Sequence, residues 1–201
     1  MTNAFQDRTL MDMSNSTNTT QQQLLLPTVR NLEESRAICH EFSSVLTAGP
    51  SKLEVKDFNH PDHKIVTFDD VVTPDWGDAP TFEHVQEMIG WGHGRQNLLV
   101  HCHAGISRST ATAWGIAISN GFNEYDAFHM LKANHPSISR RNWWTNKQGT
   151  TLSDVYKRSF SPNELIVEHL ERLFGFKSGR LIKILSQSYD SYINHGDLLG
   201  E

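Results

Sequence analysis

The stretch from Asn97 to Ile118 constrains the fold of this chain more than any other part of it. Its short apolar run, Leu98 to Val100, is typical of a buried strand, and the run stops just before Cys102. After Arg108, apolar residues recur at helical spacing, and a serine stands on each side of Arg108 as a candidate cap. We therefore predict that residues 102–108 form a turn between a strand and a helix.

A turn of this kind is suited to binding an anion. It points successive backbone N–H groups at a common centre, where the helix dipole also favours negative charge. Cys102 stands at its mouth, where N–H groups and a neighbouring cation favour a nucleophilic thiolate. The planar fork of Arg108 suits two oxygens of a phosphate group. The plainer alternative is a buried structural cysteine beside a surface arginine.

The segment from His101 to Ser109, HCHAGISRS, resembles the signature loop of the cysteine-dependent protein tyrosine phosphatases. It is most similar to the dual-specificity branch and, within it, to small bacterial or phage-type proteins. Other phosphate, arsenate and sulfur-transfer enzymes share the spacing Cys-x5-Arg. The added strand and helix, together with His101, Gly105 and Ser109, make the match specific. The resemblance covers roughly residues 29 to 175.

The resemblance implies hydrolysis of a phosphomonoester through a phosphocysteine, with no metal and no cofactor. Cys102 would attack phosphorus while loop N–H groups and Arg108 hold the phosphate oxygens. The family's serine after the arginine assists departure of the thiolate, which gives Ser109 that role, compatible with a role as helix cap. His101 would hold the loop from behind, or be an ordinary strand-end histidine. The expected phosphate-binding residues are His103, Ala104, Gly105, Ile106, Ser107 and Arg108.

The same reaction needs an acid that protonates the leaving oxygen. Four aspartates follow the predicted strand 64–68, namely Asp69, Asp70, Asp75 and Asp78. Dual-specificity relatives carry their acid about thirty residues before the nucleophile, and Asp70 lies 32 residues before Cys102. We therefore predict Asp70 as the general acid. Asp75 is the alternative acid. Either Asp78 or Thr81 is expected to cap the next helix.

The expected function is that of a protein-tyrosine or dual-specificity phosphatase acting on a phosphoprotein or a small phosphomonoester. Two alternatives stay open: a phosphate-binding pseudophosphatase that docks phosphoproteins, and a rhodanese-like sulfurtransferase, which needs no upstream acid. His103 and Ile106 stand where phosphoinositide-type relatives tend to carry lysines, which weakens the case for a polyanionic substrate. The net charge of −5 argues against general nucleic-acid binding.

The sequence also limits where such a chain would work. No apolar run approaches the ~18 residues of a membrane span, and the N-terminus has no signal segment. Two cysteines make no disulfide framework, and a catalytic thiolate favours a reducing compartment, so we expect a cytoplasmic monomer. Cys39 is either a resolving thiol for Cys102 or, as we expect, a buried core residue. Zinc-type spacing of cysteines and histidines is lacking, and we expect no metal site.

Strands that alternate with helices predict an α/β fold, a three-layer sandwich with a central, mainly parallel sheet of about four or five strands. The site is expected at the carboxyl end of a central strand. We predict strands at 24–26, 44–48, 64–68 and 98–100. Helices are expected at 28–42, 82–89, 111–118, 124–133, 161–174 (with Ser161 as cap and Pro162 in the first turn) and, more weakly, 180–193.

Four regions are expected along the chain. Residues 1–26 form a polar, disordered leader, because their composition buries too little apolar surface to offset the ordering entropy. Residues 27–176 form the phosphatase-like catalytic domain, and 177–201 a helical tail. Within the domain, 137–160 is expected to be an insertion relative to the family. Its Arg140, Arg141, Trp143 and Trp144 would bind a phosphate-rich partner or form a solvated loop anchored by the tryptophans.

Overall fold

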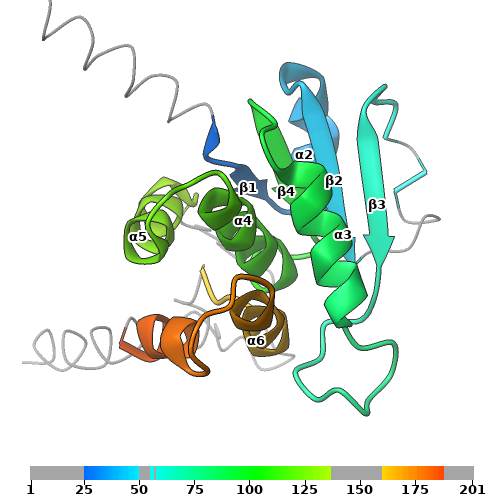
Figure 1. Ribbon diagram of the computed structural model, residues 1–201. Helices are drawn as coiled ribbons and strands as arrows, with labels where there is room; N and C mark the ends of the chain where they lie inside the picture. The colour runs from blue at the N-terminus through cyan, green and yellow to red at the C-terminus, as the bar shows by residue number, and fades with distance from the viewer. Residues whose placement is uncertain (1–24, 50–54, 57, 137–159, 188–201) are drawn as a thin grey trace, which may run out of the picture.

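The computed structural model describes residues 25–49, 55–56, 58–136 and 160–187 (Figure 1). The expected leader up to residue 24, the expected insertion from 137 to 159 and the tail from residue 188 lie outside the described residues. The elements are β1 (Thr28–Arg30), α2 (Leu32–Ile38), a 3-10 turn (Cys39–Glu41), β2 (Ser44–Gly49), β3 (His63–Thr67), α3 (Phe82–Gly92), β4 (Leu98–His101), α4 (Arg108–Ser119), α5 (Glu124–Asn134) and α6 (Glu164–Leu173). Residues 180–187 are also helical.

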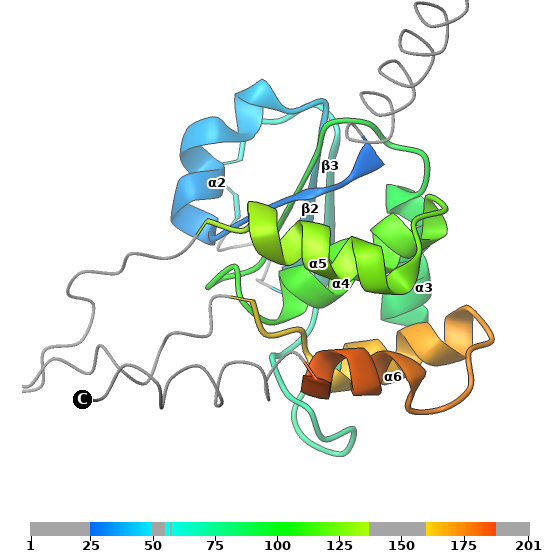
Figure 2. The same ribbon diagram turned by 90° about the vertical axis from the view of Figure 1, so that its left-hand side faces the viewer.

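The strands form one sheet in the order β1-β4-β2-β3, and every described pair is parallel. Helix α2 covers one face, whereas α3, α4 and α5 cover the other (Figures 1 and 2). Helix α6 packs outside them against α3 and α4. The predicted α/β sandwich with a central parallel sheet flanked by helices is confirmed.

Alternate residues of the strands face two separate cores, as the pleat of a strand requires. Leu46 and Val100 point to the larger core, where Trp114 of α4 is fully buried. Val45 and Leu99 point to a smaller core beneath α2, which also contains Phe58 and Cys39. Cys39 is therefore a buried core residue, the simpler of the two interpretations that the sequence allowed.

The N-terminal part of the expected helix 28–42 is a strand instead. Residues 28–30 form β1, at the edge of the sheet beside β4, and residues 24–26 contribute no strand among those described. The helix begins only after Asn31, whose side chain accepts the backbone N–H of Glu34 at 2.8 Å. Asn31 is a good N-cap, and it divides the segment into an edge strand and a short helix.

The structure also defines the caps of two other helices, one of which differs from the expected cap. Helix α6 begins at Glu164 with Asn163 as its cap, not Ser161, because the Asn163 Oδ1 accepts the N–H of Ile166 at 3.1 Å. Helix α3 is capped by Thr81 through a capping box with His84, so Asp78 is not its cap.

The main core extends beyond residue 176, where the sequence placed the end of the catalytic domain. Leu181 and Leu185 are buried in it. The buried Glu171 carboxylate accepts the N–H groups of Gly179 and Leu181 at 2.7 and 2.6 Å, which fixes the start of helix 180–187 against α6. In the described part of the chain, no helix is both long and apolar enough to cross a bilayer.

Candidate active site

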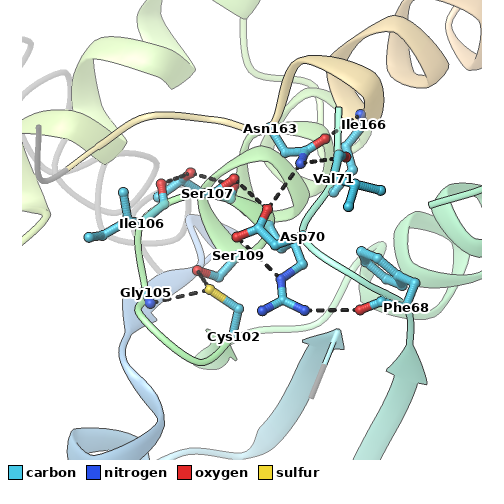
Figure 3. Close-up of polar contacts among 12 residues, drawn as sticks. Phe68, Asp70, Val71, Cys102, Gly105, Ile106, Ser107, Ser109, Asn163 and Ile166 are labelled. Carbon is cyan, nitrogen blue, oxygen red and sulfur yellow. Dashed lines mark hydrogen bonds and ion pairs between the residues drawn. The ribbon is translucent and has the colours of Figure 1, made fainter. Parts of the chain in front are cut away.

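The loop 102–107 leaves the carboxyl end of β4, which lies between β1 and β2, and leads into α4. Cys102 lies at its start, with 1% of its surface exposed. The thiol sulfur accepts the N–H of Gly105 at 3.2 Å and lies 3.1 Å from the hydroxyl oxygen of Ser109, which is fully buried (Figure 3). The loop thus encloses its own cysteine and brings it to the first turn of α4.

The carbonyl groups of the loop are bonded outward, away from the thiol. Their donors come from separate segments of the chain: Leu32 N to His103 O (3.1 Å), His135 Nε2 to Gly105 O (2.7 Å), Ser161 N to Ile106 O (3.0 Å) and Asn163 N to Ser107 O (3.2 Å). In a trans peptide the carbonyl and the following N–H point in opposite directions. Fixing these carbonyls outside therefore turns the next N–H groups inward, which forms an anion-binding nest around the sulfur.

Gly105 is needed because the loop packs tightly against the junction of β1 and α2. It has a φ of +72°, in the region that favours glycine. A Cβ at this position would lie 2.7 Å from the backbone nitrogen of Asn31 and 2.8 Å from the carbonyl carbon of Arg30. Both contacts are with backbone, which cannot move aside easily. Any side chain here would push the loop away from the sheet.

Arg108 extends from the first turn of α4 across the end of β2. One guanidinium nitrogen, Nη1, donates to the carbonyl of Phe68 at 2.9 Å. A second, Nε, is buried without a hydrogen bond among the described residues, and its ion-pair partner, the Asp70 Oδ2, is 3.6 Å away. Phe68 therefore fixes the orientation of the guanidinium plane, while Nε is left available for an oxygen of a ligand.

The path of Arg108 depends on Gly49, the last residue of β2. A Cβ on Gly49 would lie 2.1 to 2.7 Å from atoms of the Arg108 side chain, and its φ of +103° already favours glycine. The sequence alone predicts a strand at 44–48 and assigns no role to Gly49. A glycine at that strand end would have been the only signal available.

Asp70 lies over the loop and is held there by two donors. Its Oδ1 accepts the Ser107 hydroxyl at 2.8 Å and the Asn163 side-chain amide at 3.0 Å (Figure 3). The same amide group donates to the carbonyl of Val71 at 3.1 Å. The cap of α6 therefore positions the aspartate, a role for Asn163 that the sequence analysis missed.

The other three aspartates of the acidic loop are placed differently. Asp69 and Asp78 bond to each other across the base of the loop: Asp69 N donates to Asp78 O at 2.7 Å, and Asp78 N donates to Asp69 Oδ2 at 3.1 Å. Asp75 is exposed. Of the four candidates, Asp70 is the one bonded to the signature loop.

His101 lies behind the cysteine and is fully buried. Its Nδ1 lies 3.3 Å from the Cys102 carbonyl oxygen, and its ring stacks on Phe58 with centroids 4.8 Å apart. Burial lowers the pKa of His101 to about 3, although the bond to the Cys102 carbonyl acts in the opposite direction. At neutral pH the ring is therefore uncharged and supports the loop by hydrogen bonding.

The structure thus brings Cys102, Arg108, Ser109 and Asp70 together around one loop, with His101 beneath it. His103 and Ala104 lie in that loop, and the carbonyl of His103 is held by α2. His135, which holds the Gly105 carbonyl, was not foreseen, because it follows a helix and has no motif around it. Within the described residues, no group of three or more His, Cys, Asp or Glu side chains gathers as a metal site would require.

No protein-family model matches the sequence, and no curated protein matches it. The solved structures that are similar to the chain include the following two. The crystal structure of DUSP15 is 21% identical, covers 83% of this chain and 92% of its own, and has a TM-score of 0.47. The crystal structure of Tk-PTP in the active form is 17% identical, covers 73% and 88% respectively, and has a TM-score of 0.40. The chemistry of the site rests on the contacts described above.

Proposed function

We propose that the protein hydrolyses phosphomonoesters through a phosphocysteine, as a protein-tyrosine or dual-specificity phosphatase. One observation carries the proposal: the Cys102 thiol accepts the N–H of Gly105 within the loop, and the Asp70 carboxylate bonds the same loop at Ser107 and pairs with Arg108. A nucleophile, a phosphate clamp and an acid are the three parts that phosphoryl transfer to cysteine needs.

The reaction proceeds in two displacements. The Cys102 thiol gives its proton to solvent, and Asp70 takes up a proton from solvent once substrate has displaced its carboxylate from Arg108. The thiolate then attacks phosphorus, the bond to the leaving oxygen breaks, and Asp70 gives that oxygen its proton. Water then attacks the phosphocysteine while Asp70 takes a proton from it, and the S–P bond breaks. The Ser109 hydroxyl, 3.1 Å from the sulfur, stabilises the departing thiolate by donating a hydrogen bond. The loop N–H groups and Arg108 hold the non-reacting oxygens throughout.

The resting contacts also account for how substrate engages the acid. A phosphate dianion that reaches Arg108 Nε competes for the position beside it that the Asp70 carboxylate occupies. Once Asp70 is released from Arg108, it keeps its hydrogen bonds from Ser107 and Asn163. It then faces the loop on the side where the leaving group departs. Replacing one anion by another leaves the charge of Arg108 compensated.

Asp70 also distinguishes the proposal from its two rivals. Neither a phosphate-docking pseudophosphatase nor a sulfurtransferase needs a carboxyl group bonded to the loop. The substrate we propose is a phosphorylated protein side chain in the cytoplasm, where a thiolate stays reduced. A small phosphomonoester would react by the same steps.

The test is turnover of p-nitrophenyl phosphate without added metal. We expect activity that a chelator leaves intact and vanadate inhibits. Cys102→Ser should abolish it, whereas Cys39→Ser, at the other cysteine, should not. An active Cys102→Ser variant or a metal-dependent rate would overturn the phosphocysteine mechanism. Transfer of sulfur from thiosulfate to cyanide, with no phosphate release, would support the sulfurtransferase instead.

A further inference from the structure

Three polar side chains form a continuous line through the smaller core. Thr47 of β2 lies directly opposite His101 of β4 in the parallel pairing, and both are fully buried. The Thr47 hydroxyl lies 2.7 Å from His101 Nε2 and 2.7 Å from Nε2 of His63, the first residue of β3. His63 is only partly buried, so the line runs from near the surface to the carbonyl of Cys102.

The direction of each hydrogen bond in this line follows from its two ends. The Cys102 carbonyl can only accept, so the proton of His101 must be on Nδ1. An uncharged ring then has a lone pair on Nε2, and the Thr47 hydroxyl must donate to it. That hydroxyl has no second proton. Its oxygen therefore accepts from His63, which must carry a proton on Nε2.

We propose that Thr47 and His63 are positioning residues that lock His101 in the tautomer which supports the nucleophile's loop; the proposal rests on the function proposed above. Without the hydroxyl, the buried Nε2 of His101 loses its donor and is left with an unsatisfied lone pair. The ring is then no longer held where its Nδ1–H bonds the Cys102 carbonyl. The peptide then turns, and the N–H groups that stabilise the thiolate lose their alignment.

The surroundings of the line fit this role. Phe58 stacks on His101 almost in parallel, with an interplanar angle of 5°, so ring rotation is restricted. The charged or titratable groups that act on His101 are His63 from β3 and Arg36 from α2, and His60 acts on His63. None of these is a carboxylate, which would favour a charged imidazole. The hydroxyl of Thr47 is thus the donor that Nε2 requires once the Cys102 carbonyl has fixed the proton on Nδ1.

The matched pair Thr47→Val and Thr47→Ser tests the proposal, because valine keeps the branched shape without the hydroxyl and serine keeps the hydroxyl. In a Cys39→Ser background, the rate of Cys102 alkylation by iodoacetamide is measured against pH. Loss of one hydrogen bond corresponds to an upward shift of the alkylation midpoint by about half to one pH unit in the valine variant. The serine variant should retain the wild-type midpoint. Equal midpoints for valine and wild type would overturn the proposal.

Two further measurements do not depend on the valine variant folding. Nitrogen-15 NMR of the wild-type imidazoles should show His101 protonated at Nδ1, and protonation at Nε2 would refute the scheme. His63→Gln keeps an N–H donor for Thr47, whereas His63→Phe does not, so only the phenylalanine should shift the midpoint. These readouts require no turnover. If Cys102→Ser retained phosphatase activity, the proposed function would fail while the tautomer result stood.

Discussion

The Oδ2 of Asp70 lies 3.6 Å from Nε of Arg108, the guanidinium nitrogen that has no hydrogen bond among the described residues. The proposed acid and the proposed phosphate clamp therefore neutralise each other in the resting protein. Only 12% of the Arg108 side chain is exposed, and a cation so enclosed needs a compensating charge. Substrate must replace one member of this pair, which ties substrate binding to release of the acid.

Asp70→Asn should impair poor leaving groups far more than good ones. A tyrosyl oxygen needs a proton as it departs, and general acid catalysis is worth about 10²–10⁴ in such a case. An activated phenol leaves nearly as well without help. We expect turnover of phosphotyrosine peptides to fall much more than turnover of p-nitrophenyl phosphate. Asp75→Asn is the control, since Asp75 is exposed. If it alone shows the leaving-group dependence, the acid has been assigned to the wrong aspartate.

Arg108→Lys should reduce kcat/KM by about 10²–10³ although the charge is kept. Arg108 uses Nη1 to bond the Phe68 carbonyl and keeps Nε for the ligand, and a single ammonium cannot do both. The measurement is steady-state turnover of an aryl phosphate. Retention of most activity by the lysine variant would show that Arg108 is not the clamp.

Asn163→Asp should separate helix capping from positioning of the acid. Aspartate caps a helix as well as asparagine does, so the cap of α6 is kept. Its carboxylate, however, cannot donate to Asp70, and it places a second negative charge beside it. We expect phosphotyrosine turnover to fall by at least tenfold. Asn163→Ser, which keeps a cap without adding a charge, should lose less. Wild-type activity in the aspartate variant would mean that Asn163 does not position Asp70.

Gly49→Ala, at the carboxyl end of β2, should disable the site by displacing the Arg108 side chain. The new Cβ would lie within 2.7 Å of Arg108 side-chain atoms, so the guanidinium must leave its place. Gly94→Ala is a matched control, because Gly94 also has a positive φ, +72°, but no atom lies within 4 Å of a Cβ there. Alanine is strained at a positive φ, so both variants should lose some stability. Only Gly49→Ala should also lose affinity for phosphate. Similar inhibition constants for vanadate in the two variants would contradict this.

Stability should decrease as the pH falls below about 6.5. Burial lowers the pKa values of His135, His63 and His101 in the native protein. In the unfolded chain these histidines are protonated near pH 6.5, whereas in the native protein they stay neutral at that pH. Because the unfolded state binds more protons, the free energy of unfolding decreases with falling pH. The contribution of His101 to this decrease in the free energy of unfolding continues until the pH reaches its native pKa of about 3.

Urea unfolding at pH 7 and pH 5 measures this effect. His135→Gln can still donate to the Gly105 carbonyl but cannot titrate, so it should flatten the pH dependence. His40→Gln, at an exposed histidine, should leave it unchanged. An unfolding free energy that is the same at both pH values in the wild type would refute the assignment of neutral buried histidines.

The signature loop could be predicted because its strand, turn and helix are consecutive in the sequence. The residues that hold the loop in place could not be predicted, since they depend on contacts between residues far apart in the chain. Ser161 and Pro162 form a good local helix start. The N–H of Ser161 is bonded to the Ile106 carbonyl, however, and the helix begins at Glu164 with Asn163 as its cap. Likewise, Val29 fits a helical pattern as well as a strand. Its pairing with Val100 of β4 places it in a strand.

His135 and Ser161 hold the carbonyls of Gly105 and Ile106, which are consecutive residues. The residue that follows α5 and a residue just before α6 are therefore anchored on neighbouring carbonyl groups of the same loop. Between such anchors, each doubling of the intervening length adds only about 0.6 kcal/mol of closure entropy. A change in the length of the segment between His135 and Ser161 therefore costs little in closure entropy, and both ends of that segment stay bonded to the loop of Cys102.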